Sequence, residues 1–179
     1  MTHAHRRPAS ARPPSDTPIR KVDALDRRII GLLQRDGRMT NTEMARQLRV
    51  TETTVRKRAG ALIEDGLLTV VGVPDPAVAG FTLSAIVGIR VHLKALREVS
   101  ARLRTWPEVR YVGLATGRYD IIIEAFFTDQ EHVLDFVTAK LGVLEGVVAV
   151  ESSLILKVEK FSYEWEIDEA AEPDDLPRR

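Results

Sequence analysis

Cysteine is absent from this chain of 179 residues. Its absence excludes disulfide frameworks and thiolate metal sites, and it favours a reducing compartment, so we expect a cytoplasmic protein. No apolar run approaches the roughly 18 residues that a membrane helix needs. The opening residues, MTHAHRRPASARPP, are basic but have no apolar stretch behind them. We therefore expect neither a secretory signal nor a membrane partner.

An excess of either charge is also lacking, since 26 basic and 26 acidic residues leave a formal net charge of +0. The charges are unevenly placed. Residues 1–21 are rich in Pro and Arg and predict a disordered basic arm, which either stays solvated or lies along DNA phosphates. Residues 164–179 predict an acidic tail. A basic front and an acidic rear fit a DNA-binding half followed by a half that does not touch DNA.

Residues 22–73 predict three short helices and a wing. Apolar residues recur at helical spacing in each helix, and the first helix should end at Asp36-Gly37 with a left-handed residue. Residues 67–73 are β-rich and predict a small wing. The expected caps of the three helices are, in order, Asp23 or Asp26, Thr40 or Asn41, and Thr51. Three helices of this kind predict a winged helix-turn-helix whose third helix enters the major groove of double-stranded DNA.

The third helix carries the candidate DNA contacts. Its buried stripe should be Val55, Ala59 and Leu62, which leaves Arg56 pointing outward as the best candidate for a bidentate contact to a guanine. Arg58 has two equal interpretations, a DNA contact or an ion pair with an acid of the first helix. The remaining candidates are the helix N-terminal residues Thr51, Thr53 and Thr54, and, for phosphates, Arg38, Arg49 and Lys57.

A second domain is predicted over residues 81–163, after a linker at residues 74–80. Strands are expected at residues 83–91, 109–116, 119–127 and 147–158, the middle two forming a hairpin around Gly117-Arg118. Helices are expected at residues 93–103 and from Asp129 onward. The order βαββαβ predicts an α+β, ferredoxin-like fold.

These motifs together resemble the Lrp/AsnC (feast/famine) family of transcription regulators. The resemblance rests on LDRRIIGLLQRDGRMT, TETTVRKR, the hairpin Gly117-Arg118-Tyr119-Asp120 and the last strand, and it spans roughly residues 23–162. The family usually has Gly, a hydrophobic residue and Ser before helix three, where this chain has Arg49-Val50-Thr51. It often has Asp or Asn where Arg118 stands, and Thr-x-Thr where this chain has Val150-Glu151-Ser152.

The resemblance places an effector site around the hairpin. Gly117 permits a tight turn and close approach of a ligand, while Asp120 could hold an ammonium and Arg118 a carboxylate. An amino acid is therefore the favoured effector class. The alternative is a hairpin in which Gly117 only turns the chain and Asp120 is a local cap. The predicted effector residues are Gly117, Arg118, Tyr119, Asp120 and Ser152.

No cofactor or metal is expected. His92 and His132 stand alone in the sequence, without an acid or a Ser/His partner at useful spacing.

The strands are apolar on both faces, as Ile121-Ile122-Ile123 illustrates. Helices can cover one face of a sheet, and a second subunit is the simplest cover for the other. The resemblance implies a homodimer through this domain and assembly of dimers into octamers.

The leading hypothesis is a sequence-specific transcription regulator that responds to a small molecule. The alternatives are an architectural DNA-binding protein without a ligand and, less favoured, an enzyme like the sirohaem decarboxylases, which resemble the family in both domains.

Overall fold

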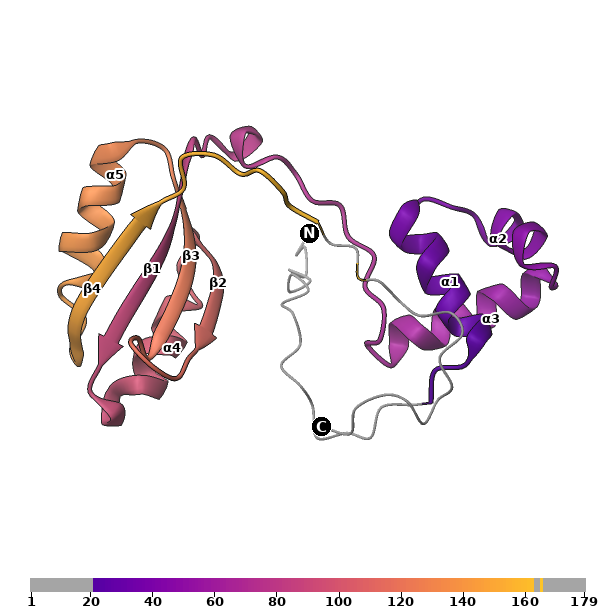
Figure 1. The fold of residues 1–179 in the computed structure, drawn as a ribbon, viewed down its shortest axis with the longest axis horizontal. Helices are drawn as coiled ribbons and strands as arrows, with labels where there is room; N and C mark the ends of the chain where they lie inside the picture. Colours follow the sequence, from indigo (N-terminus) through magenta and orange to yellow (C-terminus); the bar gives the residue numbers. More distant parts are fainter. Residues whose placement is uncertain (1–20, 163–164, 166–179) are drawn as a thin grey trace, which may run out of the picture. The chain divides into compact units, whose positions relative to one another are not determined.

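The computed structural model describes residues 21–162 and residue 165. The chain divides into two compact units, whose boundary lies between Gly72 and Val73 (Figure 1). Nearly all of the arm predicted at residues 1–21 and of the tail predicted at residues 164–179 lies outside the described residues.

The N-terminal unit consists of α1 (Ala24–Arg35), α2 (Asn41–Leu48) and α3 (Glu52–Glu64). Asp23, Thr40 and Thr51 cap the three helices through side-chain oxygens that accept backbone N–H groups, as predicted. Asp23 and Asp26 form a reciprocal capping box at the start of α1. The stripe predicted for the third helix is confirmed, since Val55, Ala59 and Leu62 are buried. The small core contains residues of all three helices: Ile29, Leu32, Met44, Ala45, Leu48, Val55, Ala59 and Leu62.

Two local predictions in this unit are wrong. Gly37 does not have a positive φ, and α1 ends instead at an extended Asp36 whose N–H bonds to the carbonyl of Leu32. Residues 67–73 contain no β-strand and therefore do not form the predicted wing. Val70, Val71 and Val73 are instead about half exposed. A β-rich segment becomes a strand only when a neighbouring strand satisfies its backbone groups.

The C-terminal unit has the predicted βαββαβ order. Its elements are β1 (Leu83–Val91), α4 (Leu96–Leu103), β2 (Val109–Leu114), β3 (Ile121–Phe127), α5 (Gln130–Asp135) and β4 (Val147–Leu154). The sheet is antiparallel with the order β2-β3-β1-β4, so the α+β, ferredoxin-like prediction is confirmed. The predicted linker contributes a short 3-10 turn, Pro76–Ala79.

Several boundaries differ from the prediction. A 3-10 turn, Leu93–Ala95, precedes α4, and a π-helical turn, Phe136–Leu141, follows α5. Strands β2 and β3 stop short of the hairpin tip, and β4 ends at Leu154 rather than at residue 158. Beyond these strand ends the N–H of Ala115 still bonds to the carbonyl of Asp120 at 2.9 Å, and the N–H of Asp120 bonds to the carbonyl of Ile89 at 3.0 Å, so the turn itself spans residues 116–119.

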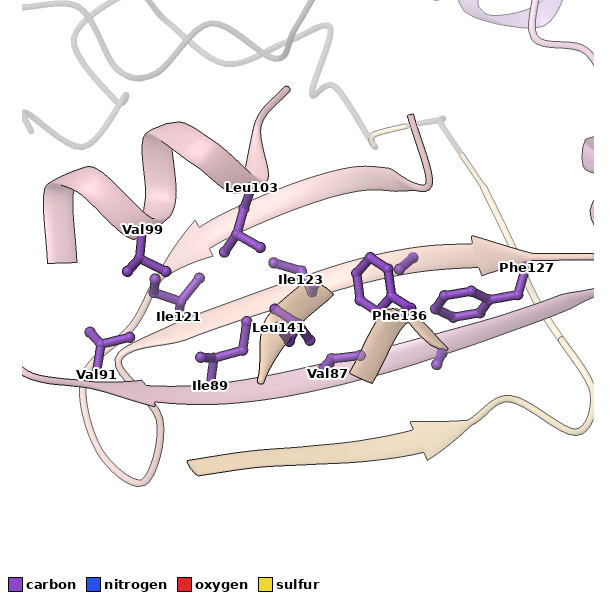
Figure 2. Close-up of a cluster of buried hydrophobic side chains, with 12 residues drawn as sticks. Val87, Ile89, Val91, Val99, Leu103, Ile121, Ile123, Phe127, Phe136 and Leu141 are labelled. Carbon is purple, nitrogen blue, oxygen red and sulfur yellow. The ribbon is translucent and has the colours of Figure 1, made fainter. Parts of the chain in front are cut away.

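One face of the sheet holds the core of this unit. Figure 2 shows Ile89 of β1 and Ile121 of β3 beside Val99 and Leu103 of α4 and Phe136 of the π-helical turn. We call the opposite side the open face. Its apolar side chains include Ile86, which is 39% exposed, the half-buried Ile122 and Phe126, and Tyr111, which is 55% exposed and pairs with Glu124.

Candidate DNA-binding surface and effector site

The first turn of α3 is a hydroxyl-capped helix N-terminus. The Oγ1 atom of Thr51 accepts the N–H of Thr54 at 3.2 Å and lies 2.8 Å from the Oγ1 atom of Thr54. These two hydroxyls thus stabilise the helix start, whereas the side chain of Thr53 is exposed. An exposed helix N-terminus favours a phosphate or a polar base edge.

Arg56 and Lys57 lie on the exposed side of α3, opposite the buried stripe. The side chain of Arg56 is 63% exposed and has a loose ion pair with Glu52, with 3.8 Å between Nη1 and Oε1. Glu52 also accepts a hydrogen bond from the hydroxyl of Thr42 at 2.8 Å, which links the starts of α2 and α3. A surface pair of this kind is worth at most about 1 kcal/mol, so Arg56 remains available to a DNA base.

Arg49 occupies a strained backbone position between α2 and α3. Its φ of 57° is the only positive φ of a non-glycine residue in the described part of the chain. Its N–H closes α2 by bonding to the carbonyl of Ala45, and its side chain is exposed. A left-handed conformation costs an ordinary L-residue roughly 1–2 kcal/mol. The exposed side chain of Arg38 lies in the turn between α1 and α2.

Arg58 makes the second of its two predicted contacts, the ion pair with helix one. Its Nη1 atom lies 2.6 Å from Oδ2 of Asp23 and 3.4 Å from the fully buried carboxylate of Asp26. Burial alone would raise the pKa of Asp23, but the Asp26 amide and the Arg58 guanidinium outweigh it and lower that pKa. Arg58 thereby ties α3 to the capping box of α1.

The predicted effector hairpin folds back across the end of the sheet. Gly117 has a φ of 107°, which confirms its role as a turn residue. The carboxylate of Asp120 accepts the N–H of Val91 at 2.8 Å, next to an irregularity in the β1–β4 ladder between Arg90 and Val91. Asp120 therefore caps a backbone N–H group of its own chain, which is the alternative interpretation of this residue in the sequence.

Arg118 reaches from the hairpin to the open face of β4. Its Nη2 atom lies 2.6 Å from Oε2 of Glu151, and its guanidinium lies 5.4 Å from the centre of the Tyr119 ring. A hydrogen bond with Glu151 is the main reason why the pKa of Tyr119 is raised. Arg118, Tyr119 and Glu151 thus form one polar cluster, although Glu151 was not among the predicted site residues.

The ring of Tyr119 lies directly over Gly88 of β1. A Cβ atom on Gly88 would come within 2.6 Å of Cγ and 2.7 Å of both Cδ atoms of that ring. Only glycine leaves this space. A glycine inside a strand rich in β-branched residues is a signal of close approach, and it could have drawn attention to this position.

Comparison with known proteins identifies the family. Residues 22–63 match the AsnC-type helix-turn-helix domain and residues 84–165 match the Lrp/AsnC ligand binding domain. An uncharacterised HTH-type transcriptional regulator of Pyrococcus furiosus is 34% identical over 143 residues, which are 79% of this chain and 97% of that protein. The regulator LrpA of Pyrococcus abyssi is 33% identical over 137 residues, 76% of this chain and 97% of LrpA.

The chain belongs to the Lrp/AsnC family. It is a transcriptional regulator of the Lrp/AsnC type, with a helix-turn-helix domain and a ligand-binding domain. The solved complex of the Neisseria meningitidis regulator NMB0573 with L-Met superimposes with a TM-score of 0.75 at 29% identity, covering 80% of this chain and 96% of that one. Escherichia coli AsnC, at 22% identity and a TM-score of 0.73, shares the fold.

The left-handed backbone at Arg49 of this Lrp/AsnC protein is one that glycine adopts without penalty, so a non-glycine residue there is strained. This chain retains the left-handed turn and adds a cation to it.

Ser152 does not join the polar cluster of this Lrp/AsnC protein. It pairs in register with Val87, whose side chain is in the core, whereas Glu151 pairs with Gly88. Because paired residues share a face of the sheet, Ser152 lies on the face opposite Glu151. A shallow depression of about 430 Å³, lined by Thr82, Thr128 and Asp129 among others, contains none of the predicted effector residues.

His132 is not isolated as the sequence suggested. Its Nε2 atom lies 3.3 Å from Oε1 of Glu108, a buried carboxylate that also accepts a short hydrogen bond from Lys140. Glu108 and His132 are 24 positions apart, so spacing alone did not connect them. Among the described residues, no cluster of His, Asp and Glu fits a metal ion, and no helix has the length and apolarity to cross a bilayer.

Proposed function

We propose that this protein binds specific sequences of double-stranded DNA through α3 and the turns that flank α2. The exposed side chains of Thr53, Arg56 and Lys57 on one side of α3 carry this proposal. Arg56 reads a base edge, and Arg38, Arg49 and Lys57 contact phosphates. Thr51 and Thr54 hold the helix N-terminus in shape, and Arg58 acts within the fold rather than on DNA.

The test is a DNA shift on the promoter of the protein's own gene across a range of salt concentrations. We expect Arg56→Ala to weaken specific binding by roughly 1–3 kcal/mol and to relax sequence preference at one position. Arg97→Ala is the matched control, since it removes the same charge from an exposed position on α4. Equal binding by the Arg56 variant and the wild type would contradict a base contact.

We further propose that a small-molecule effector, an amino acid, binds near the hairpin at Gly117, Arg118 and Tyr119. The complex of the Neisseria relative with L-Met supports the ligand class. The opposite charges of the exposed Arg118 and Glu151 side chains support this location for the effector site. An architectural, ligand-free role is the second candidate, because Asp120 and Arg118 already have partners within the chain.

Two copies of the chain are proposed to pair through the open face, with assembly of dimers into octamers as a further step. Half-buried Ile122 and Phe126 on that face support the pairing, since exposed apolar sheet surface favours a partner. Light scattering of the intact chain should show at least a dimer at micromolar concentration, and Ile122→Glu should lower the mass. A wild-type monomer at that concentration would contradict the proposal.

A further inference from the structure

The surface proposed to face DNA contains one acid, Glu52, among basic side chains. Residues 51–58, which include the first two turns of α3, hold this single acid and three basic residues. The next acid on the helix is Glu64, its last residue. DNA phosphates repel a carboxylate that comes close to them. An acid at the start of α3 therefore needs either a structural reason or a contact with DNA that offsets the repulsion.

The carboxylate of Glu52 is held from two sides. Its Oε2 atom accepts the hydroxyl of Thr42, the second residue of α2, at 2.8 Å. Its Oε1 atom lies 3.8 Å from Nη1 of Arg56, one turn further along α3, and the Glu52 side chain is still 48% exposed. The distance to Arg56 exceeds the length of a hydrogen bond, so Oε1 can accept one from a group outside the chain.

A purely structural role does not explain this orientation. An acid in the first turn of a helix stabilises the helix dipole, and an exposed pair one turn apart adds little. Both effects act through charge and need no fixed direction of the carboxylate. The hydrogen bond from Thr42 supplies that direction, and it ties the carboxylate to the start of the neighbouring helix.

We propose that Glu52 is a second base reader of α3, whose Oε1 atom accepts the N4 amino group of a cytosine in the major groove. This inference rests on the proposed DNA binding through α3, in which the N-terminal residues of the recognition helix reach base edges. Guanine presents only acceptors in this groove, and adenine presents an acceptor beside its amino group, whereas cytosine presents the amino donor alone. A carboxylate, which only accepts, therefore selects cytosine.

Glu52 and Arg56 then read base pairs that lie close together. Residues one turn apart on a helix have Cβ atoms about 5–6 Å apart, and successive base pairs are stacked at about 3.4 Å. The loose pair between the two side chains separates easily, because exposed ion pairs are weak. The operator should therefore contain a cytosine within two base pairs of the guanine read by Arg56.

Selection of binding sites by the full chain from a library of randomised DNA duplexes tests the inference. The wild type should prefer C over the other bases by roughly fivefold or more at one position. This position should lie within two base pairs of the one at which Arg56→Ala loses its preference. In Glu52→Gln the amide oxygen still accepts the Thr42 hydroxyl, but the side chain now carries a donor beside an acceptor, the pattern that matches adenine. We expect the preferred base to change from C to A.

Glu43→Gln is the matched control, since it removes the same charge from an exposed position in the first turn of α2. It should leave every base preference unchanged. An unchanged preference for C in Glu52→Gln, or a gain in affinity that is equal for all sequences, would overturn the inference and leave Glu52 a purely electrostatic role. Binding through α3 would then still stand on the loss of preference in Arg56→Ala. A wild-type chain without any base preference would overturn both the inference and the proposed sequence-specific binding.

Discussion

Replacing Gly88 by alanine should destabilise the C-terminal unit because a methyl group has no room beneath Tyr119. The new Cβ atom would lie 2.6 Å from Cγ, at the root of the ring rather than at its flexible end. Overpacking of this kind typically costs about 1–3 kcal/mol. Alanine recovers roughly 0.5–1 kcal/mol through its lower conformational entropy in the unfolded chain. The difference between these ranges is roughly 0–2.5 kcal/mol, and we expect a net loss of about 1 kcal/mol.

Urea unfolding followed by tryptophan fluorescence measures this loss in the relevant unit. Trp106 packs edge-on against Phe136 in the core of the C-terminal unit, with 5.3 Å between ring centres. Trp165 is 80% exposed and should change little on unfolding. The fluorescence transition thus reports mainly on the C-terminal unit.

Gly113→Ala is the matched control on the neighbouring strand β2. The Cβ atom there would meet the hydroxyl end of Tyr111, a side chain that is 55% exposed and can swing away. We expect less than about 0.5 kcal/mol of destabilisation, as for most surface changes. In a double-mutant cycle, Tyr119→Ala should remove most of the penalty at position 88. A Gly88→Ala variant as stable as wild type, or a cycle without coupling, would refute the packing argument.

Three further changes test other parts of the structure. Arg49→Gly should raise the unfolding free energy of the N-terminal unit by roughly 1 kcal/mol, since glycine relieves the left-handed strain. The same variant should bind DNA more weakly, with a salt dependence reduced by about one phosphate contact. Unchanged DNA binding would show that Arg49 does not contact DNA. Arg58→Met should lower the unfolding free energy of the N-terminal unit by about 1–3 kcal/mol, because it removes the ion pairs with Asp23 and Asp26. Thermal unfolding followed by the helical signal measures this loss, and the folded variant should still bind DNA. Loss of DNA binding at full stability would contradict the structural role of Arg58. Burial alone would raise the pKa of Glu108, but hydrogen bonds, that from Lys140 first among them, lower it below 4.5. The stabilising contribution of Glu108 is therefore present above that pH and is lost as the pH falls through the lowered pKa. In Glu108→Gln the unfolding free energy should fall less steeply on acidification, and an unchanged pH dependence would show that other carboxylates dominate.

Local chemistry made most of the elements predictable. The caps at Asp23, Thr40 and Thr51 lie at fixed short spacings from the N–H groups that they accept, so their roles follow from neighbouring residues. The strand at residues 83–91 was predicted with its observed bounds, because its β-branched residues favour extended backbone. The order of such elements was sufficient to predict the ferredoxin-like fold.

Tertiary structure decided which polar side chains face one another. Residues 67–73 have strand-like composition but no pairing strand, so composition alone could not predict their conformation. Asp120 became a cap because the ladder is irregular beside Val91, 29 positions away. Glu151 reached Arg118, and Ser152 did not, because sheet register sets the face on which each residue of β4 lies. Register depends on contacts between distant segments, whereas a cap or a periodicity is complete within a few residues of chain.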